Sequence, residues 1–518
     1  MSAGSTWHGQ VFEVRVGPPG HGGFCVARHE GRVLFVRHAL PGELVRALVT
    51  EDRGGSFCRA DAIDILEPSP DRVPARCPVS GPGGAGCCDF TFATPAAQRD
   101  LKHQVVADQL RRLADWEPDF VVESIPVPLG LPSGVASQDV HAFSRPGGPV
   151  RLGVKDETPA APPGRIGGVA THLAGTLIAG QGRPAPSGAA VPAGGASSLD
   201  LSEGGWRSRV RLVVDADGRA GVHRYRSTEV IADLRCPQPM AGAVDGLAER
   251  KWTPGADLVV AVDGDGMRHI VEVAPAEAES GDRRAHGRRG GDRRERVWGA
   301  GASGRGGDRR SAAARRAAAH GPRDERVVEG SGRAVQYVAG RRWELSATGF
   351  WQPHYGAAQC YSDVVAEWSA AAPGSLVWDL YCGVGVFAAR LAEQVGDTGT
   401  VHGVEFARSA VTEGRAALRD LPQVALTAER VERWIHEQPS TAPDVVVLDP
   451  PRAGAGKDVV NALAERSPNR IIHIGCDPAA FARDLGLYRA AGYHPAALRV
   501  FDAFPATHHI ECITLLQR

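Results

Sequence analysis

The stretch LVWDLYCGVG at positions 376–385 decides the fold of the C-terminal part of this chain. Its apolar start, Leu376–Trp378, is typical of a buried strand, and the glycines that follow let the backbone turn sharply and approach a ligand. Strand-like and helix-like segments then alternate to the end of the sequence. This alternation predicts a doubly wound, Rossmann-like α/β domain over residues 331–518, with a mostly parallel sheet and an antiparallel strand at its edge.

The turn itself carries a DxxxGxG pattern made by Asp379, Gly383 and Gly385, and Glu405 follows the next predicted strand. A carboxylate in that place can accept hydrogen bonds from both hydroxyls of a ribose. NAD enzymes use similar glycine turns, so the glycines alone are weak evidence. The acid that ends the first strand makes this turn resemble the S-adenosylmethionine turn of class I methyltransferases. Another nucleotide, or plain packing of the turn, is the alternative.

Two further motifs follow strands of the same predicted sheet. Asp449 begins DPPR after Val445–Leu448, and Cys476 lies in GCDP after Ile471–Ile474. Because the carboxyl ends of parallel strands border the ligand crevice, we expect both side chains there. Two prolines stiffen the turn at Asp449 and so hold this side chain at the crevice. The alternative is an aspartate that only caps a turn. The helix predicted to follow Cys476 favours a thiolate, whereas most lone cysteines are inert core residues.

The rest of the chain divides by composition. Short Val- and Ile-rich runs between Gly9 and Leu66 predict a small, OB-like β-barrel in residues 1–70. Residues 71–275 are expected to form a central α+β region, with a hairpin that turns at Asp215–Gly218. Residues 276–330 repeat GDRR three times and have almost no large apolar side chain, which predicts a disordered insertion. Its arginines either hold phosphates loosely or have no specific role.

Overall composition limits the class of protein. Hydrophobic residues are 43% and charged residues 23%, which is typical of a soluble globular protein. The formal net charge is −1, so a nucleic-acid-binding surface has to be a local patch. The sequence shows neither a signal peptide nor an apolar run of about 18 residues, so we expect a cytoplasmic protein that does not contact membranes. Clustered cysteines in a reducing compartment indicate metal binding or catalysis.

Five blocks resemble, in order, the RNA uridine-C5 methyltransferases, which include enzymes for tRNA and for 23S ribosomal RNA. The blocks are WDLYCGVGVFA, GVEFARSAV, VVVLDPPRAG, HIGCDPAAFARDL and FPATHHIEC. The N-terminal barrel, with its HALPGELV, resembles the TRAM domain of many members. The resemblance covers nearly the whole chain. It implies S-adenosylmethionine-dependent methylation of an RNA uridine, with 23S rRNA favoured over tRNA, by a protein that we take to be a monomer.

The resemblance also implies roles for single residues. Cys476 matches the nucleophile that attacks carbon 6 of the uracil, which makes carbon 5 nucleophilic. Glu511 matches the general base that removes the carbon 5 proton afterwards. Asp449, the acid of DPPR, and Gln352 match residues at the cofactor and the target base. The positions that match the family's cofactor site are Gln352, Asp379, Gly383, Gly385, Glu405 and Asp449.

Many family members carry a [4Fe–4S] cluster on three clustered cysteines and a distant fourth. The matching residues here are Cys77, Cys87, Cys88 and Cys236. The spacing departs from the family's pattern, because the second position falls on Ala85 and Cys87 has to replace it. Neighbouring cysteines rarely ligate one metal together without a contorted backbone. A metal-free remnant and a zinc site are the alternatives.

Two rival functions remain. Methyltransferases that act on exocyclic amines also carry DPPR-like motifs, but they need no cysteine nucleophile. A non-catalytic RNA-binding or assembly protein would account for the altered cysteine spacing and the Arg-rich insertion. The intact set of Gln352, Asp449, Cys476 and Glu511 counts against that second reading.

Overall fold

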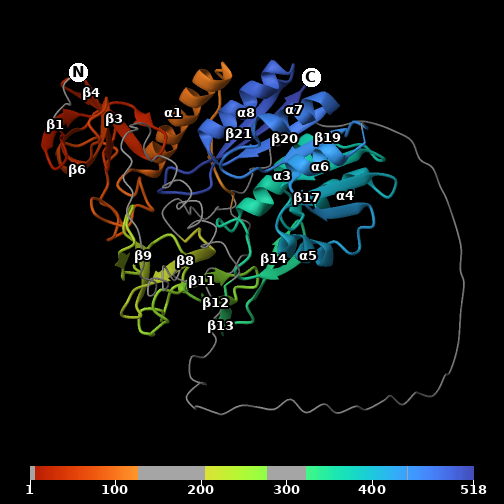
Figure 1. Ribbon diagram of the computed structural model, residues 1–518, viewed down its shortest axis with the longest axis horizontal. Helices are drawn as coiled ribbons and strands as arrows, with labels where there is room; N and C mark the ends of the chain where they lie inside the picture. Colours follow the sequence, from red (N-terminus) through yellow and green to blue (C-terminus); the bar gives the residue numbers. More distant parts are fainter. Residues whose placement is uncertain (1–5, 127–204, 277–322, 440) are drawn as a thin grey trace, which may run out of the picture. The chain divides into compact units, whose positions relative to one another are not determined.

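The computed structural model describes residues 6–126, 205–276 and 323–518, apart from position 440. Residues 277–322 of the insertion predicted at 276–330 therefore lie outside the described residues, whereas its end, Glu325–Glu329, forms a strand. The described residues form an N-terminal curled sheet, a central sheet and a large C-terminal sheet covered by helices (Figure 1). Among the described helices, none has the length and apolar character needed to cross a membrane.

The predicted N-terminal barrel is a curled sheet of six strands in the order β1-β5-β6-β4-β3-β2. Alternate side chains point inward, so that Val45, Ala47 and Val49 of one strand are all buried. The strands are β1 (Val11–Arg15), β2 (Pro19–Gly20), β3 (Phe24–His29), β4 (Arg32–Arg37), β5 (Leu44–Glu51) and β6 (Phe57–Glu67).

The central sheet is antiparallel and has the order β10-β9-β8-β11-β12-β13. The predicted hairpin is confirmed: Asp215 Oδ1 accepts hydrogen bonds from the backbone N–H groups of Asp217 and Arg219, which closes the turn. A separate hairpin, β14 (Arg333–Val338) and β15 (Arg341–Ser346), follows. The sheet's strands are β8 (Arg209–Val214), β9 (Ala220–His223), β10 (Val230–Ile231), β11 (Asp257–Val262), β12 (Arg268–Val273) and β13 (Glu325–Glu329).

The C-terminal sheet has eight strands in the order β18-β17-β16-β19-β20-β22-β21-β7. Strands β16 to β20 are parallel, as predicted. The prediction of an antiparallel strand at the edge of the sheet is wrong. Strand β22 is antiparallel but lies between β20 and β21, and β7 forms that edge. The strands are β7 (Val122–Ser124), β16 (Leu376–Leu380), β17 (Thr400–Glu405), β18 (Val424–Ala428), β19 (Val445–Leu448), β20 (Arg470–Gly475), β21 (His494–Asp502) and β22 (Glu511–Gln517).

Helices bury both faces of this sheet, which is why its central strands are continuously apolar. In β19, Val445 and Val447 belong to one core cluster, whereas Val446 and Leu448 belong to the cluster on the opposite face. The helices are α1 (Pro95–Ala114), α3 (Ala357–Ser369), α4 (Val386–Val395), α5 (Arg408–Ala417), α6 (Val431–Glu437), α7 (Gly456–Arg466) and α8 (Pro478–Ala490).

Helix α1 and strand β7 fall within the expected central region, yet they join the C-terminal sheet. Thr94 caps α1, and the helix packs along α8 (Figure 1). Val106 and Leu110 of α1 lie in the same core cluster as Tyr488 of α8. Arg489 donates hydrogen bonds to the last carbonyls of α1, so the C-terminal end of that helix is also held.

The close approach of α1 and α8 predicts an unusual effect at Gly486. Alanine normally stabilises a helix relative to glycine by up to about 1 kcal/mol. Here a Cβ would lie 2.6 Å from the backbone oxygen of Leu113, which cannot move without shifting α1. We expect Gly486→Ala to lower the free energy of unfolding by about 1–3 kcal/mol in urea titrations. Arg483→Ala, on the exposed side of α8, is the control, and a stabilised Gly486→Ala would contradict the packing.

Candidate active site

The strand order brings the predicted catalytic residues to one end of the C-terminal sheet. Strands β19 and β20 end just before Asp449 and Cys476. Strand β22 runs in the opposite direction and begins at Glu511, and its next residue, Cys512, pairs with Gly475. Glu511 and Asp449 both exert an electrostatic effect on Cys476. The nucleophile and base expected from the resemblance are therefore neighbours.

The glycine turn lies at the same end, directly after β16. Gly383 has a φ of +55°, and no atom lies within 4 Å of the place where a Cβ would be, so the turn is open to a ligand. Glu405 accepts hydrogen bonds from the N–H groups of Gly383 (3.2 Å) and Ala407 (2.7 Å), which orients its carboxylate. Its remaining lone pairs can accept from a ribose. Gln352 lies half-buried between β15 and α3.

Asp379 is fully buried beneath this turn. Its Oδ2 accepts a hydrogen bond from Ala388 N at 2.8 Å, whereas its Oδ1 has no partner. Burial raises the pKa of this carboxyl to about 8, and the charges of Asp449 and Glu405 act in the same direction. An unpartnered acceptor with a high pKa is suited to a cationic ligand. The sulfonium and amino groups of S-adenosylmethionine have that charge, so the residues fit this cofactor.

Cys476 is partly exposed at the start of α8, and Asp477 caps that helix by accepting from Ala479 N and Ala480 N. The helix therefore begins where the sequence predicted. Burial nevertheless raises the pKa of the Cys476 thiol to about 12, and the negative charges of Glu511 and Asp449 add to the effect. These effects outweigh the helix dipole, so the Cys476 thiol is neutral near pH 7.

The two carboxyl groups beside Cys476 also hold protons unusually tightly. Burial raises the pKa of Asp449 to about 7. Burial and the charge of Asp449 raise the pKa of Glu511 well above its ordinary range, while Arg452 opposes the shift. Like charges in a buried space cannot all ionise together. The site formed by Cys476, Asp449 and Glu511 therefore carries little negative charge near neutral pH.

Sequence reasoning assigned no role to Arg452, His508 and His509, although all three lie in quoted motifs. A nitrogen of the Arg452 guanidinium lies 3.2–3.3 Å from both ring nitrogens of His509. Arg452 also lowers the pKa of Cys476, so it supplies the positive charge of the site. The sequence features that could have revealed them are a cation three positions after Asp449 and two histidines just before Glu511.

The aromatic pair next to Gln352 separates into two environments. Trp351 is 5% exposed and packs against Trp343, with ring centroids 6.3 Å apart. Phe350 is 72% exposed. Trp351 is thus a core residue, and only Phe350 is free to contact a substrate.

The structure brings the four predicted metal-binding cysteines together as a chain of contacts. Cys77 contacts Cys236 and Cys88, and Cys88 also contacts Cys87. Gln238 donates a hydrogen bond to Cys88 Sγ at 3.0 Å. Across the described ranges, no group of three or more His, Cys, Asp or Glu side chains is arranged to hold a metal ion. The predicted [4Fe–4S] cluster is therefore not supported.

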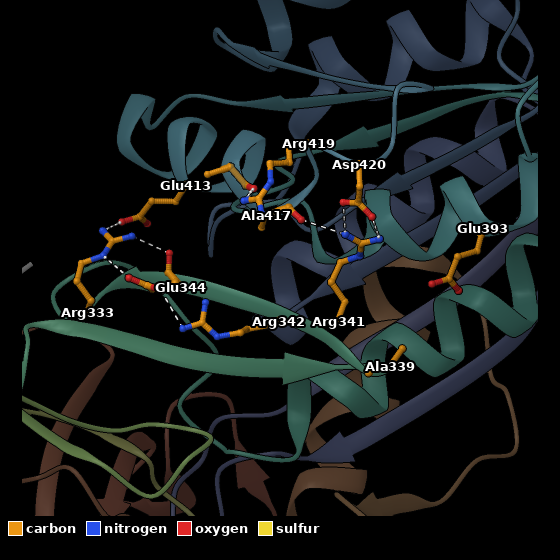
Figure 2. A pocket seen from close by; sticks show the side chains of 12 residues that line it. Arg333, Ala339, Arg341, Arg342, Glu344, Glu393, Glu413, Ala417, Arg419 and Asp420 are labelled. Atoms are coloured by element: carbon orange, nitrogen blue, oxygen red, sulfur yellow. Dashed lines mark hydrogen bonds and ion pairs between the residues drawn. The ribbon is translucent and has the colours of Figure 1, made fainter. Parts of the chain in front are cut away.

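A cavity of about 710 Å³ opens elsewhere, between the β14–β15 hairpin and α5 (Figure 2). Three of its four arginines are paired with acids: Arg333 lies 2.8 Å from Glu413, Arg341 lies 2.7 Å from Asp420 and Arg342 lies 2.9 Å from Glu344. None of the predicted site residues lines this cavity. Because the charges largely neutralise one another, it offers little attraction to phosphate.

Two segments of the chain match known protein families. Residues 6–62 match the TRAM domain model, and residues 439–518 match the model of tRNA (uracil-5-)-methyltransferase. An uncharacterized RNA methyltransferase of Streptomyces avermitilis is 36% identical over 98% of each chain. This chain belongs to the RNA uracil-5-methyltransferase family. It is an S-adenosylmethionine-dependent RNA methyltransferase.

Two further similarities are informative about this methyltransferase. A protein of Alkalilimnicola ehrlichii named 23S rRNA (uracil(1939)-C(5))-methyltransferase RlmD is 28% identical, over 98% of this chain and 97% of its own. The crystal structure of Pyrococcus abyssi tRNA (uracil-54, C5)-methyltransferase with S-adenosyl-L-homocysteine superposes with a TM-score of 0.55 at 16% identity. The match covers 98% of this chain and 100% of that one, so the described parts of this chain share its fold.

The buried Asp379 predicts a pH-dependent stability. Its folded pKa of about 8 exceeds the value of about 4 in an unfolded chain, so its stabilising effect is complete below pH 4 and is lost as the pH rises through 8. Asp379→Asn keeps the acceptor for Ala388 but cannot ionise. From pH 5 to 8, the free energy of unfolding of wild type should fall relative to this variant by up to about 1.4 kcal/mol per pH unit in urea titrations. Parallel pH curves would contradict the buried charge.

Proposed function

We propose that this methyltransferase modifies carbon 5 of a uridine through a covalent bond between Cys476 and carbon 6. The observation that carries the proposal is the meeting of Cys476, Asp449 and Glu511 at the end of the sheet that also bears the glycine turn. An enzyme that methylates an exocyclic amine would need neither a buried thiol nor a second carboxyl beside it. S-adenosylmethionine supplies the methyl group.

The Cys476 thiol gives up its proton to the Asp449 carboxylate, and its sulfur bonds to carbon 6 while the electron pair of the C5=C6 bond moves into the enolate. Asp449, now protonated, can donate to a uracil oxygen, where the enolate charge develops. With S-adenosylmethionine bound, carbon 5 would take its methyl group while the methyl–sulfur bond breaks, and S-adenosylhomocysteine would leave. The Glu511 carboxylate removes the remaining carbon 5 proton, the C5=C6 bond re-forms, and the sulfur leaves as a thiolate that regains the proton held by Asp449.

The positive charge of the bound methyl donor explains how a neutral thiol becomes reactive. Cys476 and Glu511 hold their protons because burial and nearby carboxyls disfavour negative charge. A sulfonium brought into the same buried space lowers the pKa of both groups. We therefore expect S-adenosylmethionine and RNA together, rather than RNA alone, to produce the reactive thiolate.

The target uridine has to leave its stack to reach the sheet end. Phe350, exposed beside Gln352, offers an aromatic face on which an extruded base can stack. We propose 23S rRNA as the substrate in preference to tRNA. The support is the relative named as a 23S rRNA methyltransferase, which aligns over the whole chain, together with the N-terminal TRAM domain. A cytoplasmic monomer is the form that we propose.

Trapping the covalent adduct tests the proposal. We would incubate the protein with S-adenosylmethionine and 5-fluorouridine-containing transcripts of 23S rRNA or tRNA, because fluorine at carbon 5 prevents the final proton removal. We expect a denaturation-stable complex with wild type and with Cys58→Ala, which removes a buried barrel cysteine, but none with Cys476→Ala. The rRNA transcript should be trapped in preference. A protein that binds S-adenosylmethionine but traps neither RNA would instead be an amine methyltransferase or a non-catalytic binder.

The role of Glu511 gives a second prediction. If this carboxylate removes the carbon 5 proton, Glu511→Gln should form the adduct with ordinary uridine and fail to resolve it. Denaturing gels should then show a methylated protein–RNA complex that accumulates in the variant and turns over in wild type. Product release that is at least half as fast as in wild type would assign the proton transfer to another group.

A further inference from the structure

The loop between β21 and β22, residues 503–510, leads directly into Glu511. It is held by contacts with residues 89–102, which are about 400 positions earlier in the sequence. Lys102 of α1 donates hydrogen bonds to Asp502 Oδ1 (2.5 Å) and to the carbonyl oxygen of Phe504 (3.1 Å). Both charged side chains of this ion pair are buried. A buried, fully paired charge holds its partners in one geometry, because separating the pair leaves an unpaired ion in the core.

The middle of the loop has two more anchors on the same segment. Gln98 Oε1 accepts a hydrogen bond from Ala506 N at 2.7 Å, and Phe90 N donates to Ala506 O at 2.9 Å. Ala506 has a φ of +65°, which is costly for a residue with a side chain. The loop therefore adopts a shape that its own sequence disfavours, and residues 89–102 supply the bonds that maintain it.

Asp89 is the last anchor and the one nearest to Glu511. Its Oδ2 lies 2.5 Å from His508 Nδ1 and accepts a hydrogen bond from His508 N at 3.3 Å. Its Oδ1 accepts from Arg37 of the N-terminal sheet at 2.9 Å. Gly23 of the same sheet leaves room for this carboxylate, since a Cβ there would lie 2.5 Å from Asp89 Cγ. The side chain is almost fully buried.

The contacts continue from Asp89 to the reaction centre. The His508 ring lies against that of His509, with centroids 4.1 Å apart, and His509 contacts Arg452 beside Asp449. His508 is three positions before Glu511 in the chain. A shift of His508 would therefore change both the backbone that carries Glu511 and the guanidinium that faces it.

We propose that Asp89 is a positioning residue that sets Glu511 for the release of the methylated uridine. This inference rests on the proposed function, in which Glu511 removes the carbon 5 proton after methyl transfer. Asp89 itself touches no reacting atom. It acts through His508 and the loop, and it also ties that loop to the TRAM domain through Arg37.

The expected defect falls on one step. Cys476 is carried by the end of β20, and Asp89 reaches it only through the electrostatic effect of Arg452 and Glu511. Glu511 itself follows directly on the loop that Asp89 holds, so proton removal should depend on Asp89 much more than attack does. Asp89→Asn should therefore form the covalent adduct with ordinary uridine at a rate within about twofold of wild type. Release of 5-methyluridine should slow by about 10- to 100-fold, the usual cost of misplacing a catalytic group by about 1 Å. The adduct should accumulate in single-turnover reactions.

A matched control and a second variant make the test decisive. Asp100→Asn, on the exposed face of α1, should resemble wild type in both steps. Gln98→Met removes the acceptor for Ala506 without adding or removing a charge, and it should also slow release more than attack. If Asp89→Asn does not fold, the Gln98→Met variant tests the positioning role of the loop contacts in its place. Equal slowing of both steps, or unchanged release, in the folded variant overturns the positioning role.

The two proposals fail in distinguishable ways. If wild type traps no 5-fluorouridine RNA, the covalent mechanism itself fails and Asp89 has no release step to support. If wild type traps it and Glu511→Gln accumulates adduct, but Asp89→Asn and Gln98→Met release product normally, only the positioning role is overturned.

Discussion

The antiparallel pairing of β22 with β20 is the constraint on which the site depends. Parallel strands alone would bring Asp449 and Cys476 to one end of the sheet, because both follow strand ends. Glu511 begins a strand, so only an antiparallel strand can bring it to that same end. A shift of one residue in this register would turn Glu511 to the opposite face of the sheet. Hence β22 lies inside the sheet, where pairing on both sides holds its register.

Burial of several acids around one thiol gives the site its chemistry. Burial raises the proton affinity of all three groups, and neighbouring carboxyls add to the effect at Cys476 and Glu511, so the site carries little negative charge. A neutral thiol is also protected from oxidation, because the thiolate is the reactive form. In the proposed mechanism, the cationic methyl donor changes this balance, so that cofactor binding and activation of Cys476 are coupled through electrostatics.

The N-terminal part contributes more than a separate RNA-binding module would. Arg37 lies over the ring of Tyr225 in the central part and also donates to Asp89, so three parts of the chain meet at one guanidinium. His21, in a loop of the same curled sheet, lies 3.1 Å from Asp477, the residue after Cys476. RNA that binds the TRAM domain is therefore only a few contacts away from Cys476 and from the loop before Glu511.

Sequence alone determined the α/β order, the glycine turn, the start of α8 and the residue types of the site, because these follow from local patterns and ordered motifs. It did not determine where β22 and β7 lie, because strand order depends on packing between distant segments. The protonation of Cys476 was also hidden, since it depends on carboxyls from two other strands. Asp89 and His508 are separated by 419 positions, and no local pattern links them. Tertiary structure decided those contacts, because buried charges have to find partners wherever the fold supplies them.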